Sequence, residues 1–274
     1  MAHTRAEDLA LALQLADIAD AITLDRYQAM DLVVTNKPDN TPVTDADKAT
    51  ELAIREKLES LRPHDAIVGE EFGGVPSDAT TQSAKRYWVI DPIDGTKNFL
   101  RGVPTWATLI ALVEKNSDGV EEVVVGVVSA PALFRRWHAS TGTGAFISLN
   151  KATPTQISVS QVSNIADASI SYSDFQGWEE RLAPFQSLLQ SAWRTRGIGD
   201  FWSHMLVAEG AVDVAIEPSL ALWDMAALDV IVREAGGRFT SVAGIDGPHQ
   251  GSGLSTNSNI HAAVVGALNP GKSK

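Results

Sequence analysis

Apolar and polar positions follow two different rhythms along the chain, and these rhythms predict helices and strands. Near the N-terminus, apolar residues such as Leu9, Leu13 and Ala16 recur at helical spacing with acids between them, which predicts a helix over residues 6–30. A polar stretch rich in Pro, Asn and Asp follows and predicts a loop or hairpin. A second helix is predicted from Thr44, its candidate cap, to the helix-breaking Pro63.

Short apolar runs, closely spaced and separated by Gly-containing turns, predict an antiparallel sheet in the first half. Its strands are predicted at residues 86–90, 105–113, 120–128, 135–139 and 145–148, and residues 66–68 form a further short apolar run. Farther along, strands and helices alternate. The strands are predicted at residues 170–172, 194–198, 212–216 and 238–240, and the helices at 178–192, 201–209 and 223–235. The pattern therefore predicts an α+β N-terminal part, residues 1–155, and an α/β C-terminal part, residues 156–274, within one compact unit.

The composition narrows the classes of function. The 274 residues include 22 Lys and Arg against 34 Asp and Glu, a formal net charge of −12, which disfavours a nucleic-acid partner. No apolar run approaches the ~18 residues of a membrane helix, and the acids in the first 20 residues are unlike a signal peptide. Cysteine is absent, which excludes disulfides, thiolate metal sites and a Cys nucleophile. We expect a cytoplasmic enzyme whose metal, if any, is bound by oxygen or imidazole.

The densest polar cluster follows the predicted strand at residues 86–90. Asp91 ends this strand, Asp94 follows around the rigid Pro92, and Gly95 permits a tight turn before a helix that opens at Thr96. Two carboxylates around such a turn are typical ligands of Mg²⁺, and amides at a helix start bind phosphate. The alternative is a simple surface turn, because Asp, Pro and Gly are turn residues.

Further acids stand at turns and helix starts. Glu70 and Glu71 are adjacent in a Gly-flanked turn, where they repel each other unless a cation or solvent screens them. Asp224 and Asp47 each lie near the start of a predicted helix, and helix capping is the alternative role for both.

Taken together, these segments resemble the inositol monophosphatase family of Mg²⁺-dependent, Li⁺-sensitive phosphatases. The matching segments are TDAD at 44–47, GEE at 69–71, WVIDPIDGTKNF at 88–99, WDMAALDVIVREAGG at 223–237 and STNSNIH at 255–261. They occur in the family's order and spacing and extend over nearly the whole chain. The resemblance implies an α+β to α/β fold, namely the layered αβαβα sandwich of this family, and a homodimer.

The resemblance also implies a set of metal ligands. Glu70, Asp91 and the backbone carbonyl of Ile93 would hold a first Mg²⁺. Asp91, Asp94 and Asp224 would hold a second, and Glu70 with waters would serve a weaker third. Hard oxygen ligands of this kind also accept Mn²⁺.

The same resemblance assigns the reaction. Thr96 and Asp47 match the pair that orients and deprotonates the attacking water, and Glu71 matches an acid near that water. The amides of Gly95 and Thr96 match the phosphate cradle, and a metal-activated water attacks phosphorus without a covalent phosphoenzyme. Lys37 occupies the place of a loop lysine near the active site, and the alternative for it is a solvated loop side chain.

The substrate's organic part is expected beside the C-terminal half. In GDFW at 199–202, bulky residues replace the small ones of inositol phosphatases, and the segment resembles the histidinol-phosphate phosphatases of the same superfamily. Asp200 and Glu217 would pair with a cationic substrate, and Trp202 would stack on it. The alternative is that Asp200 caps the following helix and Trp202 belongs to the core. The full predicted substrate-contacting set is Asp94, Gly95, Thr96, Gly199, Asp200, Trp202, Glu217 and Asp224.

Other functions stay open at this point. An inositol-1-phosphate phosphatase or a broad phosphomonoesterase would use the same acids. A bisphosphate phosphatase would need a basic pocket, and no basic cluster stands out. A binding or regulatory protein with this fold would be free to lose the acid set, which is intact. Among the histidines, His204 is expected in the core and His261 in a structural role.

Overall fold

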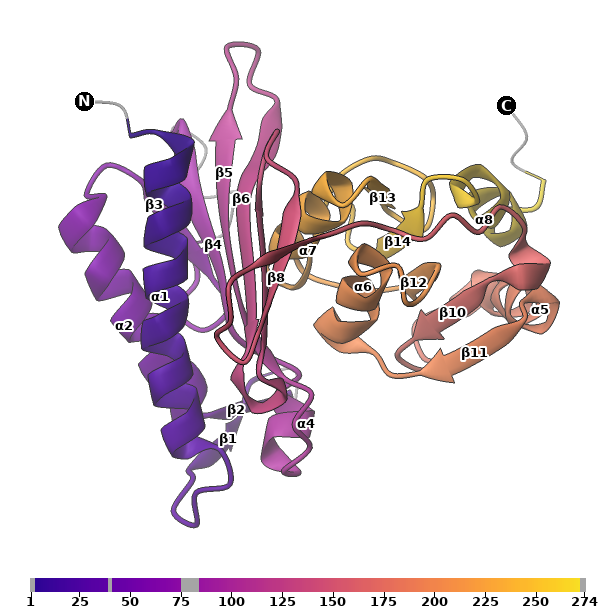
Figure 1. Ribbon diagram of the computed structural model, residues 1–274. Helices are drawn as coiled ribbons and strands as arrows, with labels where there is room; N and C mark the ends of the chain where they lie inside the picture. Colours follow the sequence, from indigo (N-terminus) through magenta and orange to yellow (C-terminus); the bar gives the residue numbers. More distant parts are fainter. Residues whose placement is uncertain (1–2, 39–40, 75–83, 272–274) are drawn as a thin grey trace.

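The computed structural model describes residues 3–38, 41–74 and 84–271, and these form five layers, αβαβα (Figure 1). Two helices cover the outer face of a seven-stranded sheet, and two more lie between this sheet and a five-stranded one. A last pair covers the far face of the second sheet. The layered sandwich expected from the sequence is confirmed.

The seven-stranded sheet has the order β3-β4-β5-β6-β7-β8-β9, and its pairs are antiparallel except for β3 with β4. Its strands are β3 (Ala66–Gly69), β4 (Arg86–Asp94), β5 (Ala107–Lys115), β6 (Glu121–Ala130), β7 (Arg135–Ser140), β8 (Ala145–Leu149) and β9 (Thr155–Ile157). A short helix, α4 (Thr96–Leu100), follows β4. The sequence predicts β4 to β8 with bounds that differ by a few residues, whereas β3 corresponds to a run noted only as apolar, and β9 is not predicted.

The five-stranded sheet is mixed, with the order β11-β10-β12-β14-β13. Its strands are β10 (Ser169–Tyr172), β11 (Arg194–Gly197), β12 (Val214–Glu217), β13 (Gly237–Thr240) and β14 (Gly253–Asn257). Its helices are α5 (Leu182–Ser191), α6 (Asp200–Ala208), α7 (Leu222–Glu234) and α8 (His261–Leu268). α6 and α7 lie between the sheets, and α5 and α8 cover the far face (Figure 1).

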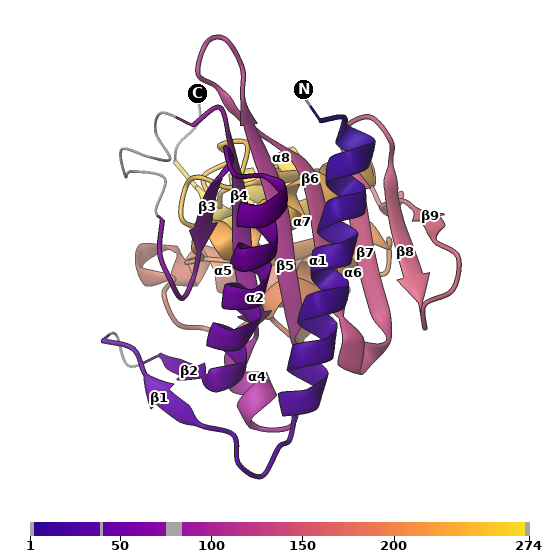
Figure 2. The ribbon, with the colours of Figure 1, turned by 90° about the vertical axis from the view of Figure 1, so that its left-hand side faces the viewer.

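The outer helices are α1 (Arg5–Arg26) and α2 (Asp45–Leu61), which lie side by side across the first sheet (Figure 2). The polar stretch between them forms the hairpin of β1 (Val34–Asn36) and β2 (Pro42–Thr44). α1 ends four residues before the predicted Met30, because Gln28 adopts a left-handed φ of 62° that a helix cannot continue.

Both faces of the first sheet are buried, so its strands are nearly continuously apolar. Along β4, Trp88 and Ile90 pack under α1 and α2, and Tyr87 and Val89 face the helices between the sheets. This alternation locks the register of β4, since a shift by one residue would exchange its two faces. The fold therefore holds the carboxyl end of β4 in a defined position.

β14 is the strand that the sequence pattern misses most clearly. It is an interior strand between β12 and β13, and all five of its residues are buried, yet its sequence is GLSTN. Its hydroxyls are satisfied by buried histidines: Ser255 hydrogen bonds to His204 (2.7 Å) and Thr256 to His261 (2.8 Å). These contacts confirm the core and structural roles expected for the two histidines.

None of the described helices is long and apolar enough to cross a membrane.

Candidate active site

The turn after β4 places two aspartates at the same edge of the first sheet. The pairing of β4 with β5 shifts register between Asp91 and Asp94, and Asp91 Oδ1 accepts the Ile93 N–H at 3.0 Å. Gly95 follows with a φ of +84°, and a Cβ there would lie 2.9 Å from the Thr105 carbonyl oxygen. Only glycine fits this tight turn without strain. The alternative interpretation as a simple surface turn is therefore wrong, because the bend is rigid and largely buried.

A third carboxylate arrives from the start of α7. Asp224 Oδ2 accepts the Ala221 N–H at 2.7 Å, so this oxygen caps the helix as the alternative interpretation expected. Asp91, Asp94 and Asp224 nevertheless each offer one oxygen, and these oxygens lie within 4.8 Å of one another. One carboxylate thus both caps a helix and joins the acid cluster.

This cluster is electrostatically unbalanced. Burial raises the pKa of Asp91 well above its usual range, and nearby Glu70, Asp94 and Asp224 raise it further. Burial likewise raises the pKa of Asp94, with Asp200 and Asp224 adding repulsion. For Asp224, burial and the neighbouring acids raise the pKa to about 7. Within the described residues, none of the three forms an ion pair with Lys, Arg or His.

The donor set fits a hard divalent cation. Three carboxylate oxygens converge, from the buried Asp91 and the half-buried Asp94 and Asp224, and no cationic side chain of the described residues pairs with them. Mg²⁺ and Mn²⁺ prefer such oxygens to nitrogen or sulfur. The Ile93 carbonyl lies on the same turn and accepts the Thr96 hydroxyl at 3.0 Å, which leaves its second lone pair available.

Glu70 and Glu71 follow β3, the neighbour of β4, and bind a lysine from the β1–β2 hairpin. Lys37 Nζ lies 2.7 Å from Glu70 Oε1 and 2.7 Å from Glu71 Oε1. Burial lowers the pKa of Lys37, but its bonds to both acids outweigh this and raise the pKa overall. Lys37 is therefore part of the site and not a solvated loop side chain. The negative charge of Glu70 raises the pKa of Asp91, which places the two carboxylates near each other.

At Glu71, burial has a larger effect on the pKa than the neighbouring Lys37. It raises the pKa of Glu71 to about 7, although the hydrogen bond from Lys37 acts in the opposite direction. The Glu70 charge next to Glu71 adds to the increase. Glu71 is thus a buried acid that changes protonation near neutral pH, beside the acids that end β4.

Asp47 combines its two predicted roles. In the capping box at the start of α2, its Oδ2 accepts the Thr44 N–H at 2.7 Å and the Thr44 hydroxyl at 2.5 Å. Its other oxygen, Oδ1, lies 3.5 Å from Thr96 Oγ1. Burial raises the pKa of Asp47 to about 6. The predicted pair of Asp47 and Thr96 is therefore assembled, with an acid able to accept a proton near neutral pH.

The GDFW turn meets the same site from the C-terminal half. The Phe201 N–H donates to Asp94 Oδ2 at 2.7 Å, and Asn98 of α4 donates to Asp200 Oδ2 at 3.0 Å. Asp200 has a left-handed φ of 52°, an unfavourable conformation for a residue other than Gly that these contacts help to maintain. Its side chain makes no capping bond to α6, so the capping interpretation is wrong.

Glu217 lies at the end of β12, next to Asp200. It is buried, and burial and the charge of Asp200 raise its pKa to about 8. Its Oε1 has no hydrogen-bond partner among the described residues. Burial raises the pKa of Asp200 itself to about 6. The two acids lie close together, and a positively charged group beside them would relieve their mutual repulsion.

The remaining predicted contacts differ in their surroundings. Trp202 is half-buried and packs against the core between the sheets, as the core interpretation expected, and its stacking role stays a prediction. Gly199, with φ +80°, sets the turn before Asp200, and its N–H donates to Ser203 at 3.0 Å. The amides of Gly95 and Thr96 lie at the start of α4 beside the acid cluster, and their phosphate role is likewise a prediction.

The sequence interpretation missed Glu51. This residue of α2 is fully buried, and its carboxylate accepts the backbone N–H groups of Glu71 and Phe72. It lies four positions after Asp47, on the same helix face. The spacing of four residues from Asp47, a candidate catalytic acid, was the feature of the sequence that could have identified Glu51.

Comparison with known proteins shows which family the chain belongs to. A model of the inositol monophosphatase family matches residues 5–271. The chain is 53% identical over 270 residues to a histidinol-phosphatase of Mycobacterium tuberculosis, covering 97% of this chain and 99% of that protein. A histidinol-phosphatase of Streptomyces coelicolor is also 53% identical, covering 96% and 97%. Among solved structures, the extragenic suppressor protein suhB from Bartonella henselae matches with a TM-score of 0.83 and 27% identity, covering 97% of this chain and 99% of that one.

The five-layered sandwich, the family match and the carboxylate cluster of Asp91, Asp94 and Asp224 together define the class, that of metal-dependent phosphatases. The chain belongs to the inositol monophosphatase family, and it is a phosphoric monoester hydrolase.

Proposed function

We propose that the protein hydrolyses L-histidinol phosphate to L-histidinol and phosphate, a step of histidine biosynthesis, with Mg²⁺ as its cofactor. The observation that carries this choice is the pair formed by the half-buried Asp200 and the buried Glu217 beside the proposed metal site. Histidinol phosphate carries an ammonium and an imidazole, whereas inositol phosphate offers only hydroxyls beyond its phosphate. The names of the two relatives at 53% identity support the same substrate.

The carboxylate cluster of Asp91, Asp94 and Asp224 indicates which residues would bind the metal. Glu70, Asp91 and the Ile93 carbonyl would hold one Mg²⁺, and Asp91, Asp94 and Asp224 a second, with Glu70 serving a weaker third. When bound, Mg²⁺ lowers the pKa of its water and neutralises charge on the phosphoryl and leaving oxygens.

The protein's own groups position and deprotonate the nucleophile. Thr96 Oγ1 would orient the attacking water, and the proton would pass through this hydroxyl to Asp47 Oδ1 at 3.5 Å. Glu71 would hold the water from a second side, and the Gly95 and Thr96 amides would bind the phosphoryl oxygens. Asp200 and Glu217 would then bind the substrate's cationic end, so that the phosphate lies against the metal cage.

The decisive experiment compares kcat/KM for histidinol phosphate, inositol-1-phosphate and glycerol phosphate under the same conditions. We expect the highest value with histidinol phosphate, loss of activity with EDTA and inhibition by Li⁺. Asp200→Asn should lower kcat/KM for histidinol phosphate at least ~10-fold more than for glycerol phosphate, because charge-assisted hydrogen bonds contribute ~1.5–3 kcal/mol.

Each outcome separates the parts of the proposal. Preference for inositol-1-phosphate would contradict the assignment of Asp200, and equal losses with both esters would return Asp200 to a structural role. Turnover that is insensitive to EDTA would refute the metal mechanism.

We further propose a cytoplasmic homodimer. Size-exclusion chromatography with light scattering checks the dimer, since a mass near that of one 29.3 kDa chain would contradict it.

A further inference from the structure

The turn after β3, which carries Glu70 and Glu71, is hydrogen bonded to the buried carboxylate of Glu51, a residue with no role in the proposed reaction. Glu51 Oε2 accepts the Glu71 N–H at 2.7 Å, and Oε1 accepts the Phe72 N–H at 3.2 Å. Arg55, one helical turn later, donates from Nε to Glu51 Oε1 at 2.7 Å. Both carboxylate oxygens are therefore occupied by N–H donors, so Glu51 is not placed as a metal ligand.

Arg55 binds the far side of the same turn. Its Nη2 donates to the Gly73 carbonyl at 2.7 Å, and its guanidinium lies 6.0 Å from the centre of the Phe72 ring. The Gly69 N–H donates to the same Gly73 carbonyl at 3.0 Å and closes the turn. The pair of Glu51 and Arg55 thus binds the backbone from Glu71 to Gly73, the segment that directly follows Glu70.

The carboxylate of Glu51 fits against the turn only because residue 69 is a glycine. A Cβ on Gly69 would lie 2.0 Å from Glu51 Oε1, far inside van der Waals contact. Gly69 is in β3 and has no positive φ, so its backbone conformation does not itself require glycine. The space at Gly69 serves the side chain of Glu51.

We propose that Glu51 is a positioning residue for the metal site. One face of α2 presents Asp47 to Thr96 and, four residues later, Glu51 to the turn that carries Glu70 and Glu71. Fixing the amides of Glu71 and Phe72 orients Glu70 toward Asp91 and Lys37 before any metal binds. The inference rests on the proposed Mg²⁺-dependent function.

The test measures metal binding directly on the purified full chain, by calorimetric titration with Mg²⁺ and Mn²⁺. Glu51→Gln should weaken binding by ~10–100-fold, the usual cost of losing a group that orients metal ligands. A glutamine places an NH₂ group among N–H donors and leaves Arg55 without its carboxylate. The matched control is Glu56→Gln, an exposed acid on the same helix, which should bind metal like the wild type.

A second variant reaches the same contact without removing the carboxylate. Gly69→Ala should displace Glu51 from the turn and weaken metal binding by at least ~10-fold, the lower end of the same range. In a Glu51→Ala background the added methyl meets no carboxylate, so Gly69→Ala should then change the Kd less than twofold. This non-additivity distinguishes positioning from a general loss of stability.

The outcomes are separable. If Glu51→Gln and Gly69→Ala lower the melting temperature but leave both Kd values within twofold of the wild type, Glu51 is merely structural and the inference is wrong. Additive effects in the double variant would also overturn it. If the wild type itself binds neither cation, the proposed function fails together with the inference, whereas tight wild-type binding that the variants retain refutes only the role of Glu51.

Discussion

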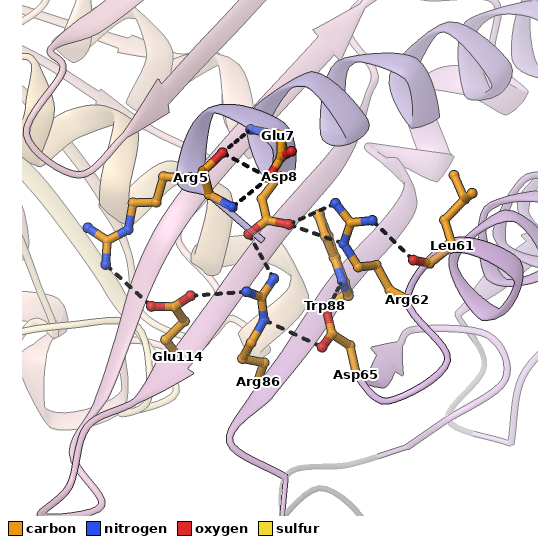
Figure 3. A network of polar contacts seen from close by, with 10 residues as sticks. Arg5, Glu7, Asp8, Leu61, Arg62, Asp65, Arg86, Trp88 and Glu114 are labelled. Carbon is orange, nitrogen blue, oxygen red and sulfur yellow. Dashed lines mark hydrogen bonds and ion pairs between the residues drawn. The ribbon is translucent and has the colours of Figure 1, made fainter. Parts of the chain in front are cut away.

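The two ends of strand β4 carry acidic clusters that are balanced in opposite ways. At its start, the buried Asp8 of α1 accepts hydrogen bonds from Arg62 at 3.1 Å and from Arg86 at 2.8 Å (Figure 3). Arg86 also lies 3.4 Å from Asp65, which in turn accepts the indole N–H of Trp88. Every carboxylate in this network lies beside an arginine.

At the other end of the strand, no arginine or lysine pairs with Asp91, Asp94 or Asp224 within the described residues. Burial and mutual repulsion raise the pKa of all three. The difference teaches how one strand serves two purposes. Arginines at its start neutralise nearby acids and connect α1, the end of α2 and the sheet. The acids at its end have no such partner, so a metal cation bound there would neutralise them.

The largest expected effect comes from removing a carboxylate at the unbalanced end. Asp94→Asn should lower kcat by about 10³-fold, equivalent to ~4 kcal/mol, because the metal it holds supplies several kcal/mol of transition-state stabilisation. Without metal, the variant should unfold at a temperature equal to or higher than the wild type, since one source of repulsion is gone. Steady-state kinetics and metal-free thermal melts measure the two effects. A lower metal-free melting temperature would contradict the account of an unbalanced cluster.

The same substitution at the balanced end should act in the opposite sense. Asp8→Asn leaves Arg62 and Arg86 without their shared carboxylate and should lower the free energy of unfolding by about 3 kcal/mol, as broken buried ion pairs do. Urea unfolding measures this loss. The kcat of the folded variant should match the wild type, so a large loss of activity at a temperature where the variant is folded would show that the network also serves the site.

A smaller effect should appear as a pH dependence of the metal-free protein. Glu217, Asp224 and Glu71 have folded-state pKa values of about 8, 7 and 7, above those of an unfolded chain. The folded state therefore binds more protons between about pH 4 and pH 8, and its stability should fall as the pH rises through that range.

We expect the metal-free melting temperature to drop by a few °C from pH 5 to pH 8, about 1–2 kcal/mol at ~2–4 °C per kcal/mol. Saturating Mg²⁺ should remove most of this slope, because the cation favours the charged carboxylates. Melting temperatures with EDTA and with Mg²⁺, measured across the pH range, check the prediction. A metal-free protein whose melting temperature rises steadily over this range would contradict it.

Much of the fold was readable from local patterns, and the exceptions have physical causes. The strands of the first sheet are apolar on both faces and stand out, whereas β14 is buried but polar, and its hydroxyls find partners only across the fold in His204 and His261. The end of α1 was misplaced because the left-handed Gln28 carries no strong signal in its sequence. The composition of residues 36–41 and 73–83 also predicts mobile loops, and of these residues 39–40 and 75–83 lie outside the described part of the chain.

The candidate site shows the same division. The acids of the GEE, DPIDG and WD segments were identifiable because their motifs are contiguous. Lys37 was placed near the site only through the family resemblance, and the roles of Glu51 and Asn98 were not identifiable, because each of the three acts on a turn that lies far away in the sequence. A lone Lys, Glu or Asn on a helix or loop gives no local sign of the backbone or carboxylate that it will meet.

The sequence by itself determined the set of chemical groups: oxygen ligands without cysteine, an excess of acids, and short motifs that place these acids at the ends of strands and the starts of helices. Tertiary structure alone decided which acids are neutralised and which are not. Asp8 and Asp91 are both buried aspartates, and only their neighbours distinguish them, two arginines for the one and further carboxylates for the other. That distinction depends on distances of a few ångströms between residues far apart in the chain, because electrostatic interaction in a protein interior is set by separation and burial rather than by sequence order.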